Sequence, residues 1–313
     1  MDAKDVRIFC ELAFKGIDYD SFTYRRVSPI AIGRKLGIDE KTVRLRVRKM
    51  EDNGFIKYYQ AMPTLALFQL KNMNTYRLEA LNIATKHRLI EHIQELPFII
   101  EATDYLGKVV SVSIAGTSFE EIDQVASGLA NRFELYKWIL GSQIIKEPVS
   151  VIDKLDWQII QALRYDALSS VKELSESLSI TSRMIEYRIK KLLGSDIILV
   201  RAIINSQKQQ GLIFYELEMS IDETKRYEVI KRLSEIYTDK LLSVRTLAAR
   251  VLLANFFAFT LAEPEEVYVN TLKLDGVRSC SLFIFKETVE SRKPNWIDDL
   301  IEQKIASSSS KSR

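Results

Sequence analysis

Cysteine and histidine are scarce in this chain, which limits the chemistry its side chains can supply. The 313 residues include only two of each. Cys10 and Cys280 lie far apart among apolar neighbours, which favours free buried thiols over a disulfide or a metal site. His87 and His92 fall in one expected helix, where their spacing turns the second ring about 140° away from the first. We therefore expect no metal and no cofactor.

Motifs of the common enzyme classes are also missing. The sequence has no glycine-rich phosphate loop, no Cys-x-x-Cys pair and no nucleophile elbow, so we expect that the chain is not an enzyme. The longest apolar run, Val251 to Ala262, is too short to span a bilayer. The N-terminal segment is acidic from its second residue and lacks an apolar signal core. We expect a cytoplasmic protein with no membrane association.

The overall charge is only mildly basic. Lys and Arg number 45 against 42 Asp and Glu, and 47% of the residues are hydrophobic, as in a globular protein. A net charge of +3 is compatible with nucleic acid but does not require it, because attraction depends on where the charges lie. Whether the chain binds nucleic acid therefore has to be judged from how its charges are distributed along the sequence.

An internal repeat organises the sequence. Leu36 to Tyr59 aligns without a gap with Leu178 to Arg201, and their apolar positions agree. Upstream, "DVRIFCEL" matches "DWQIIQAL", and the first copy carries an insertion at Gly16 to Ser28 that we interpret as a loop between helices. Downstream, the order of elements persists, as in "TYRLEA" and "FYELEM". The two halves join at Glu147 to Val151, where Pro148 breaks a strand.

The periodicities predict the same series of elements in each half, namely three helices and a hairpin, then strand, helix, two strands, helix and strand. This order predicts an α+β fold with tandem winged helix-turn-helix domains, each followed by a ferredoxin-like βαββαβ domain. The expected boundaries are 1–62 for the first winged helix, 63–148 for the first ferredoxin-like domain, and 149–206 and 207–290 for the second pair. Residues 291–313 are expected to form a C-terminal amphipathic helix and a disordered tail. We expect this helix to dock on its own α/β domain or to pair with another chain.

The third expected helix of the first half has a basic outer face. Asp39 is its expected cap, Gly54 ends it, and "FIKYYQAM" supplies a strand that can pair back as a wing. On a helical wheel Val43, Val47 and Met50 point inward, and Arg46 lies close to this buried stripe. The residues that we expect to contact DNA in this copy are Lys41, Thr42, Arg44, Leu45, Arg48, Lys49 and Lys57.

A charge run on a helix is more often a solvated face than a ligand site. Here it falls on the third helix of a repeated helix-turn-helix pattern, and that helix enters the major groove in such proteins, where cations displace counterions. The second copy is less basic, since Glu186 replaces Arg44. Its candidate DNA contacts are Arg183, Tyr187, Lys190 and Lys191. Contact with a neighbouring chain explains Tyr187 equally well.

These features resemble the Lrp/AsnC family of transcription regulators over nearly the whole chain, twice. The resemblance rests on "LGIDEKTVRLRVRKMEDNGFIKYY", "DKLDWQIIQAL", "LSITSRMIEYRIKKLLGSDII" and the hairpin "ATDYLGKVVSVSIAG". It implies double-stranded DNA as a partner, pairing through the α/β modules, and an amino acid as a candidate effector. Because family members usually hold one unit, the two halves here are expected to form a pseudo-dimer within one chain, or a homo-oligomer of chains.

The resemblance places the effector-contacting turn between the second and third strands of the α/β module. In the first half this implies Asp104 and Gly107 as candidate effector-binding residues, with a plain hairpin turn as the alternative. In the second half the turn, Thr246 to Val251, has no glycine. Without glycine's permissive backbone, close approach of a ligand to main-chain amides is harder there.

Three functions are therefore compatible with the sequence. The first is a sequence-specific transcription regulator that responds to an effector. The second is an architectural, chromatin-like protein that coats or bends DNA with little sequence preference. The third is an assembly module whose helix-turn-helices no longer bind DNA. DNA-binding measurements at several salt concentrations separate the first two, since a coating protein binds chosen and random DNA alike.

Overall fold

The computed structural model describes residues 1–13, 28–147, 151–208, 211–292 and 294–310. The expected loop at 16–28, except Ser28, and residues 148–150 of the join lie outside these ranges. The helices are α1 (Ala3–Ala13), α2 (Pro29–Leu36), α3 (Glu40–Asp52), α4 (Ile83–Ile93), α5 (Phe119–Phe133), α6 (Lys154–Leu163), α7 (Val171–Leu178), α8 (Ser182–Gly194), α9 (Arg226–Ile236), α10 (Ala262–Leu272) and α11 (Trp296–Ser310). The strands are β1 (Ile56–Pro63), β2 (Asn72–Glu79), β3 (Ile99–Tyr105), β4 (Val109–Gly116), β5 (Tyr136–Ile144), β6 (Ile198–Ile204), β7 (Ile213–Ile221), β8 (Leu241–Ala248), β9 (Val251–Ala258) and β10 (Val277–Thr288).

The chain divides into two compact units, and each draws on both halves of the sequence. The α/β unit contains Leu70–Ile145 and Gln209–Lys293. The helical unit contains Asp2–Gln69, Lys146–Lys208 and Pro294–Arg313. The expectation of a mixed α+β fold is confirmed. Among the described helices, none has both the length and the hydropathy needed to cross a membrane.

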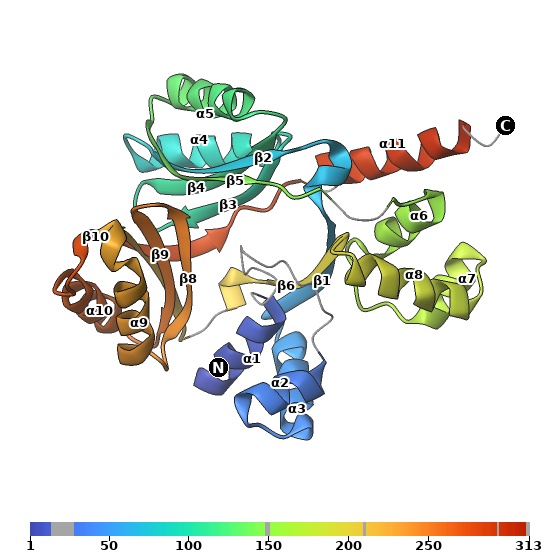
Figure 1. Cartoon of the computed structure of the whole chain (residues 1–313), viewed down its shortest axis with the longest axis horizontal. Helices are drawn as coiled ribbons and strands as arrows, with labels where there is room; N and C mark the ends of the chain where they lie inside the picture. The colour runs from blue at the N-terminus through green and yellow to red at the C-terminus, as the bar shows by residue number, and fades with distance from the viewer. Residues whose placement is uncertain (14–27, 148–150, 209–210, 293, 311–313) are drawn as a thin grey trace. The chain divides into compact units, whose positions relative to one another are not determined.

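The α/β unit is built on one eight-stranded sheet in the order β5-β2-β4-β3-β10-β7-β9-β8. We call β2 to β5 with α4 and α5 the first module, and β7 to β10 with α9 and α10 the second module (Figure 1). In each module the strands lie in the order fourth, first, third, second. Antiparallel pairing of β3 with β10, as at Tyr105 and Phe285, joins the two modules.

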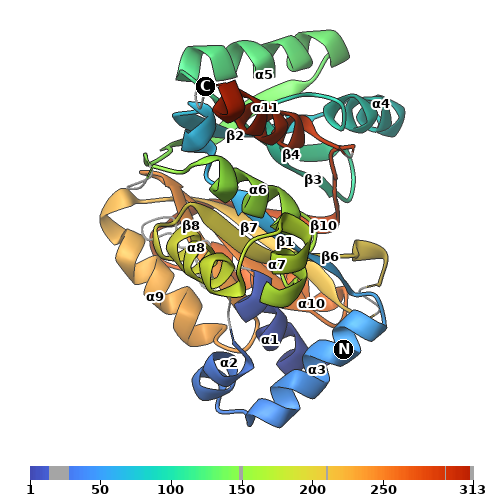
Figure 2. The same cartoon turned by 90° about the vertical axis from the view of Figure 1, so that its right-hand side faces the viewer.

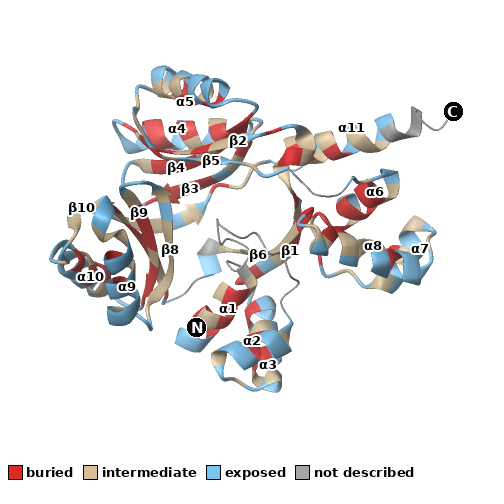
Figure 3. Ribbon diagram, in the orientation of Figure 1, coloured by how far each residue is buried: buried red, intermediate tan, exposed pale blue. Residues whose placement is uncertain are grey.

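Each module has its own apolar core on the helical face of the sheet. In the first, Leu78 of β2 packs with Leu89 of α4. In the second, Leu217 of β7 packs with Leu233 of α9. Figure 3 shows how much of these strands is buried. Because side chains alternate along a strand, the neighbouring residues, such as Arg77, point to the opposite face, which we call the inner face.

The sheet curls until its two edge strands, β5 and β8, meet. A Cβ atom on Gly141 of β5 would lie only 2.3 Å from the carbonyl oxygen of Leu247 in β8. Exposed strand edges are sites of unwanted pairing, and this contact shields both. The inner face is therefore partly enclosed within the α/β unit, since Arg77 is completely buried there while the side chains of Glu218 and Arg245 stay 18% and 24% exposed.

The helical unit contains two sets of three helices, α1 to α3 and α6 to α8 (Figure 2). The strand after each set does not fold back as the wing hairpin that we expected. Instead β1 pairs with β6 in a two-stranded antiparallel sheet, with Tyr59 opposite Ala202 and Ala61 opposite Val200. Each half offers one strand at this point, and its backbone groups need a partner, so the other half supplies it.

The C-terminal helix α11 packs against α6 of the helical unit. Ile297 and Ile301 join that core, Arg164 Nε lies 3.0 Å from Asp298 Oδ1, and the Tyr165 hydroxyl donates to Asp298. We expected this helix to dock on its own α/β domain or to pair with another chain. The amphipathic pattern showed that α11 has an apolar face, but not which surface covers it. The helix continues to Ser310, into the serine run that we expected to be disordered.

A close contact sets the turn between α2 and α3. Gly37 ends α2 in the left-handed region with φ 65°, and Ser28 caps its start. A Cβ atom on Gly33 would lie 2.5 Å from the backbone oxygen of Ile38. The second copy has Ser175 at the position of Gly33, and its hydroxyl donates to the Ile180 carbonyl at 2.5 Å. The two copies thus reach the same turn with different residues.

The Gly33 contact predicts an inverted response to alanine. A Gly→Ala change inside a helix ordinarily stabilises by about 0.5–1 kcal/mol. Gly33→Ala should instead destabilise by about 1–3 kcal/mol, because the new methyl group meets backbone that must move. Gly194→Ala in α8 is the control, since a Cβ there meets nothing within 4 Å. Urea unfolding measures both, and equal stabilities would contradict the prediction.

Candidate nucleic-acid interface

The start of α3 is fixed by its cap. The Asp39 carboxylate accepts from the Thr42 amide at 2.8 Å and from the Thr42 hydroxyl at 2.5 Å. The Thr42 hydroxyl, followed by the Thr42 amide, lowers the pKa of Asp39, which keeps the cap ionised. In the second copy Thr181 caps α8 through the Met184 amide at 3.4 Å. The Thr42 hydroxyl, one of the expected DNA contacts, is thus engaged in the cap.

One face of α3 presents cations to solvent. Val43 and Met50 are buried, whereas Lys41, Arg44, Leu45, Arg48 and Lys49 are exposed. Arg44 is held by Glu40 one turn earlier, with Nη2 2.5 Å from the carboxylate. Within the described part of the chain, the other three cations form no ion pair, so their charge is available to a polyanion. Lys57 is exposed on β1.

The matching face of α8 carries less available charge. Arg183, Tyr187 and Lys190 are exposed, but Lys190 Nζ lies 2.7 Å from the Glu186 carboxylate. Lys191 is half-buried, where it donates to the Val151 carbonyl at 3.1 Å and lies 3.5 Å from Asp156. The structure therefore places Lys191 in an internal contact. Leu45 and Tyr187, at equivalent positions, are 69% and 63% exposed.

An arginine clamp holds the third helix of each set to the first helix. Arg46 Nη1 lies 2.8 Å from Asp2 and 2.7 Å from Asp5. Hydrogen bonds to Asp2 and Asp5 raise the pKa of Arg46. Arg46 thus lies where the wheel geometry suggested, at the edge of the buried stripe.

The second set repeats the clamp at equivalent positions. Arg188 Nη1 lies 2.6 Å from Asp153 and 3.0 Å from Asp156, a carboxylate that is completely buried. The hydrogen bond to Asp153 is the largest of the contacts that raise the pKa of Arg188. Arg188 is not among the candidate DNA contacts of α8. Its alignment with Arg46, and that of the two aspartates with Asp2 and Asp5, is the signal that identifies its structural role.

The candidate effector turn is closed around a buried carboxylate. Asp104 is fully buried, 2.5 Å from Lys86 Nζ and 2.8 Å from Lys286 Nζ. Lys86 also donates to the carbonyls of Tyr105 and Gly107, at 2.7 and 2.6 Å. Gly107 has φ 83°, so the β3–β4 turn uses its conformational freedom. Effector binding at Asp104 and Gly107 stays a prediction.

The rare residues form no shared centre in the described ranges. No group of three or more His, Cys, Asp or Glu side chains is arranged there to hold a metal ion. Cys10 and Cys280 are free thiols, and burial raises the pKa of each to about 12. Burial, with the nearby Arg132, lowers the pKa of His92.

Comparison with known proteins finds a helix-turn-helix domain in the second half. An AsnC-type helix-turn-helix domain matches residues 152–193, which contain α6, α7 and most of α8. An uncharacterised helix-turn-helix transcriptional regulator of Pyrococcus furiosus is 28% identical over 131 residues, covering 41% of this chain and 88% of the relative. The domain match includes most of α8, which carries the candidate contacts of the second copy.

Whole-chain likeness is found to an enzyme. The crystal structure of the siroheme decarboxylase NirDL matches with a TM-score of 0.55 and 9% identity, covering 97% of this chain and 99% of that one. Its co-complex with an iron-uroporphyrin III analogue matches with the same score and 10% identity, covering 99% of both chains. At this identity the likeness shows the fold. It overturns the expectation that the chain is not an enzyme, because that expectation rested on missing motifs and the same fold occurs in an enzyme.

The repeated clamp generates a stability prediction. Arg46→Gln should destabilise the helical unit by about 1–3 kcal/mol, because Asp5 is left buried without its cation. Arg188→Gln should act similarly through Asp156. Arg48→Gln is the matched control on α3, and its exposed side chain should change stability by no more than about 0.5 kcal/mol. Urea unfolding followed by circular dichroism compares the three, and equal losses would show that the clamp is not structural.

Proposed function

We propose that the chain is a DNA-binding transcription regulator that presents α3 and α8 to the major groove. The observation that carries this proposal is the AsnC-type helix-turn-helix match at residues 152–193, together with the exposed cations of the equivalent helix α3. The P. furiosus relative, named as a transcriptional regulator, supports the same function. A cationic face on a third helix is what the phosphate-lined groove attracts.

We propose that α3 contributes more to DNA binding than α8. On α3, Lys41, Arg48 and Lys49 have no ion-pair partner among the described residues, whereas on α8 Glu186 engages Lys190 and Asp156 lies beside Lys191. A cation already paired with a carboxylate releases fewer counterions from DNA. We therefore assign α3 as the principal reading head. Two unlike heads would recognise imperfectly palindromic sites with half-sites about one helical turn, or a multiple of it, apart.

We also infer that the chain is a tandem duplication of one unit, a helix-turn-helix followed by a ferredoxin-like module, within the boundaries 1–62, 63–148, 149–206 and 207–290. Three observations support this inference. The element order is the same in both halves, the strand order is the same in both modules, and the arginine clamp occurs twice. The pairing of modules within the chain supports a pseudo-dimer. The proposal also includes further oligomerisation of chains and the binding of an amino acid as effector.

DNA titration with matched variants tests this function. Arg48→Gln should weaken binding about tenfold and reduce the slope of log affinity against log salt by about 1, because one phosphate or base contact is lost. Lys190→Gln should have a smaller effect, because Glu186 already neutralises that lysine. Fluorescence anisotropy with genomic fragments selected by the protein, and with random duplexes, measures both at several salt concentrations.

Arg232→Gln, on α9 of the α/β unit, is the control, since it removes one exposed cation that is not part of the proposed reading heads. Its affinity should equal that of the unmodified chain. Equal affinities and equal salt slopes for selected and random DNA would favour the architectural function. If Arg48→Gln and Lys190→Gln together leave binding unchanged, the proposed reading heads are wrong.

A further inference from the structure

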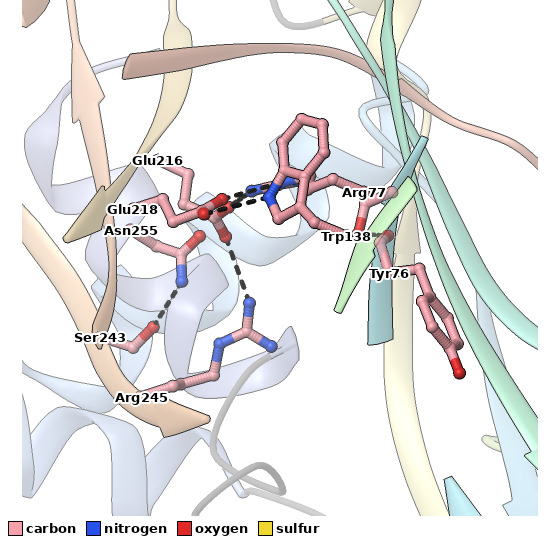
Figure 4. A network of polar contacts seen from close by, with 9 residues as sticks. Tyr76, Arg77, Trp138, Glu216, Glu218, Ser243, Arg245 and Asn255 are labelled. Atoms are coloured by element: carbon pink, nitrogen blue, oxygen red, sulfur yellow. Dashed lines mark hydrogen bonds and ion pairs between the residues drawn. The ribbon is translucent and has the colours of Figure 1, made fainter. Parts of the chain in front are cut away.

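A cluster of four charges lies between the two modules on the inner face of the α/β unit (Figure 4). Arg77 of β2 is completely buried. It forms an ion pair with Glu216 of β7, and its Nε lies 3.3 Å from Glu218 of the same strand. Arg245 of β8 lies 3.3 Å from Glu216. The cluster thus joins two cations and two anions, and the first module contributes one of the four.

Aromatic rings complete the surroundings of Arg77. Its guanidinium lies 4.5 Å from the ring centre of Tyr105 in β3 and 4.4 Å from that of Phe283 in β10, the two strands that join the modules. Trp138 donates its indole N–H to Glu218 at 3.3 Å. Burial opposes the charge on Arg77, but Glu216, Tyr105 and Glu218 together raise its pKa, so the arginine stays ionised.

The interior beside the cluster has little space for water. A cavity of about 40 Å³ is lined by Tyr105, Glu216, Arg245 and Glu101, together with hydroxyl side chains of β2 and β4. A few waters fit in such a volume. Compensation for the buried charges of Arg77 and Glu216 therefore has to come mainly from within the cluster, because an unpaired ion in a protein interior is strongly unfavourable.

The charges that meet here occupy equivalent positions in the two modules. Alignment of "TYRLEA" with "FYELEM" matches Arg77 to Glu216. The hydrogen-bond register matches it to Glu218, because Arg77 pairs with Ser111, the third residue of β4, and Glu218 pairs with Leu253, the third residue of β9. In either alignment an arginine in one module corresponds to a glutamate in the other, and the two are in contact.

Contact between equivalent residues places them close to the axis that relates the modules. In a symmetric pair of identical modules, a residue at such a position meets its own copy. Two first modules would bring two Arg77 side chains together with no carboxylate from this cluster. Two second modules would bring four carboxylates together with only two Arg245 side chains. Counting these four residues alone, only the unlike pair is neutral.

We propose that the Arg77–Glu216–Glu218–Arg245 cluster is a recognition device that makes each module pair with its unlike counterpart and reject its own copy. The partner for the inner face of the first module is therefore an acidic inner face carrying two carboxylates and one arginine. The second module of the same chain supplies that face, and the second module of another copy could supply it equally well. Specificity arises because the like pairs bury uncompensated charge.

Charge reversal in the full chain creates two complementary variants. In Arg77→Glu the cluster has three carboxylates and one arginine, and in Glu216→Arg it has three arginines and one carboxylate. Each variant alone contains no neutral combination of modules, within or between its own chains. When the two variants are mixed, every pairing between a module of one and a module of the other is neutral, so the mixture tests charge complementarity. In the double variant Arg77→Glu/Glu216→Arg only the unlike pair is neutral, so that variant tests the choice of the unlike module.

The experiment refolds the two variants, carrying different affinity tags, separately and together. Each alone should unfold about 10 °C below the unmodified chain, or fail to refold, because a buried ion has lost its partner. The mixture should recover soluble protein that contains both tags and unfolds well above either variant. The double variant Arg77→Glu/Glu216→Arg should regain most of the lost stability in one chain.

Arg232→Glu is the control, because it reverses an exposed charge on α9 in the same unit. It should refold alone, and mixing it with either variant should recover less protein than mixing Arg77→Glu with Glu216→Arg, because only one of the two exchanged pairings between first and second modules is then neutral. A mixture of Arg77→Glu and Glu216→Arg that is no more stable and no more soluble than the separate variants would overturn the proposal. The proposal would also be overturned if each variant alone formed the same module pairing and unfolded at the same temperature as the unmodified chain.

Discussion

Strand pairing between the two halves of the chain is the constraint on which the described structure depends. β1 needs β6, and β3 needs β10, because a strand edge left in the interior would carry unsatisfied backbone groups. Both units are therefore made of residues from both halves. In the α/β unit this pairing, with the contact between Gly141 and Leu247, encloses the inner face and its charges.

Once the inner face is enclosed, its polar residues must satisfy one another. Arg77 and the two glutamates of β7 do so across the modules. On the opposite face of the sheet, Asp104 of β3 pairs with Lys86 of α4 and with Lys286 of β10. Buried ion pairs contribute little net stability compared with apolar packing, but removing one partner is costly. Their presence fits a role in selecting the partner better than a role in adding stability.

In the helical unit the structural contacts are repeated in both copies, whereas the solvent-facing surfaces of α3 and α8 differ. The clamp of Arg46 recurs as that of Arg188, and the capped turn before α3 recurs before α8. The solvent-facing positions differ, with Arg44 in one copy and Glu186 in the other. The clamp and cap residues are restricted by their structural role, whereas the solvent-facing residues can differ between the copies because each copy can bind differently. The shared fold with NirDL shows that such a scaffold also occurs in an enzyme, so function depends on residues rather than on the arrangement of elements.

Local signals allowed much of the helical part to be derived from sequence. Asp39 was the expected cap of α3 and Gly54 its expected end, and both follow from local signals because caps act within one turn of the backbone. Periodicity separated the buried Val43 and Met50 from the exposed cations, and placed Arg46 at the edge. The β1–β6 pair and the contact of α11 with α6 could not be derived, since neither partner is near in sequence.

The sequence by itself determined the elements, their repetition and the outward face of α3, because these depend on spacings of three or four residues and on single capping side chains. Tertiary structure alone decided that Arg77 of β2 and Glu216 of β7 are buried. From the alternating pattern of each strand alone, Arg77 and Glu216 would be predicted to face solvent. Only the pairing of the modules turns that face inward, where opposite charges at equivalent positions neutralise each other.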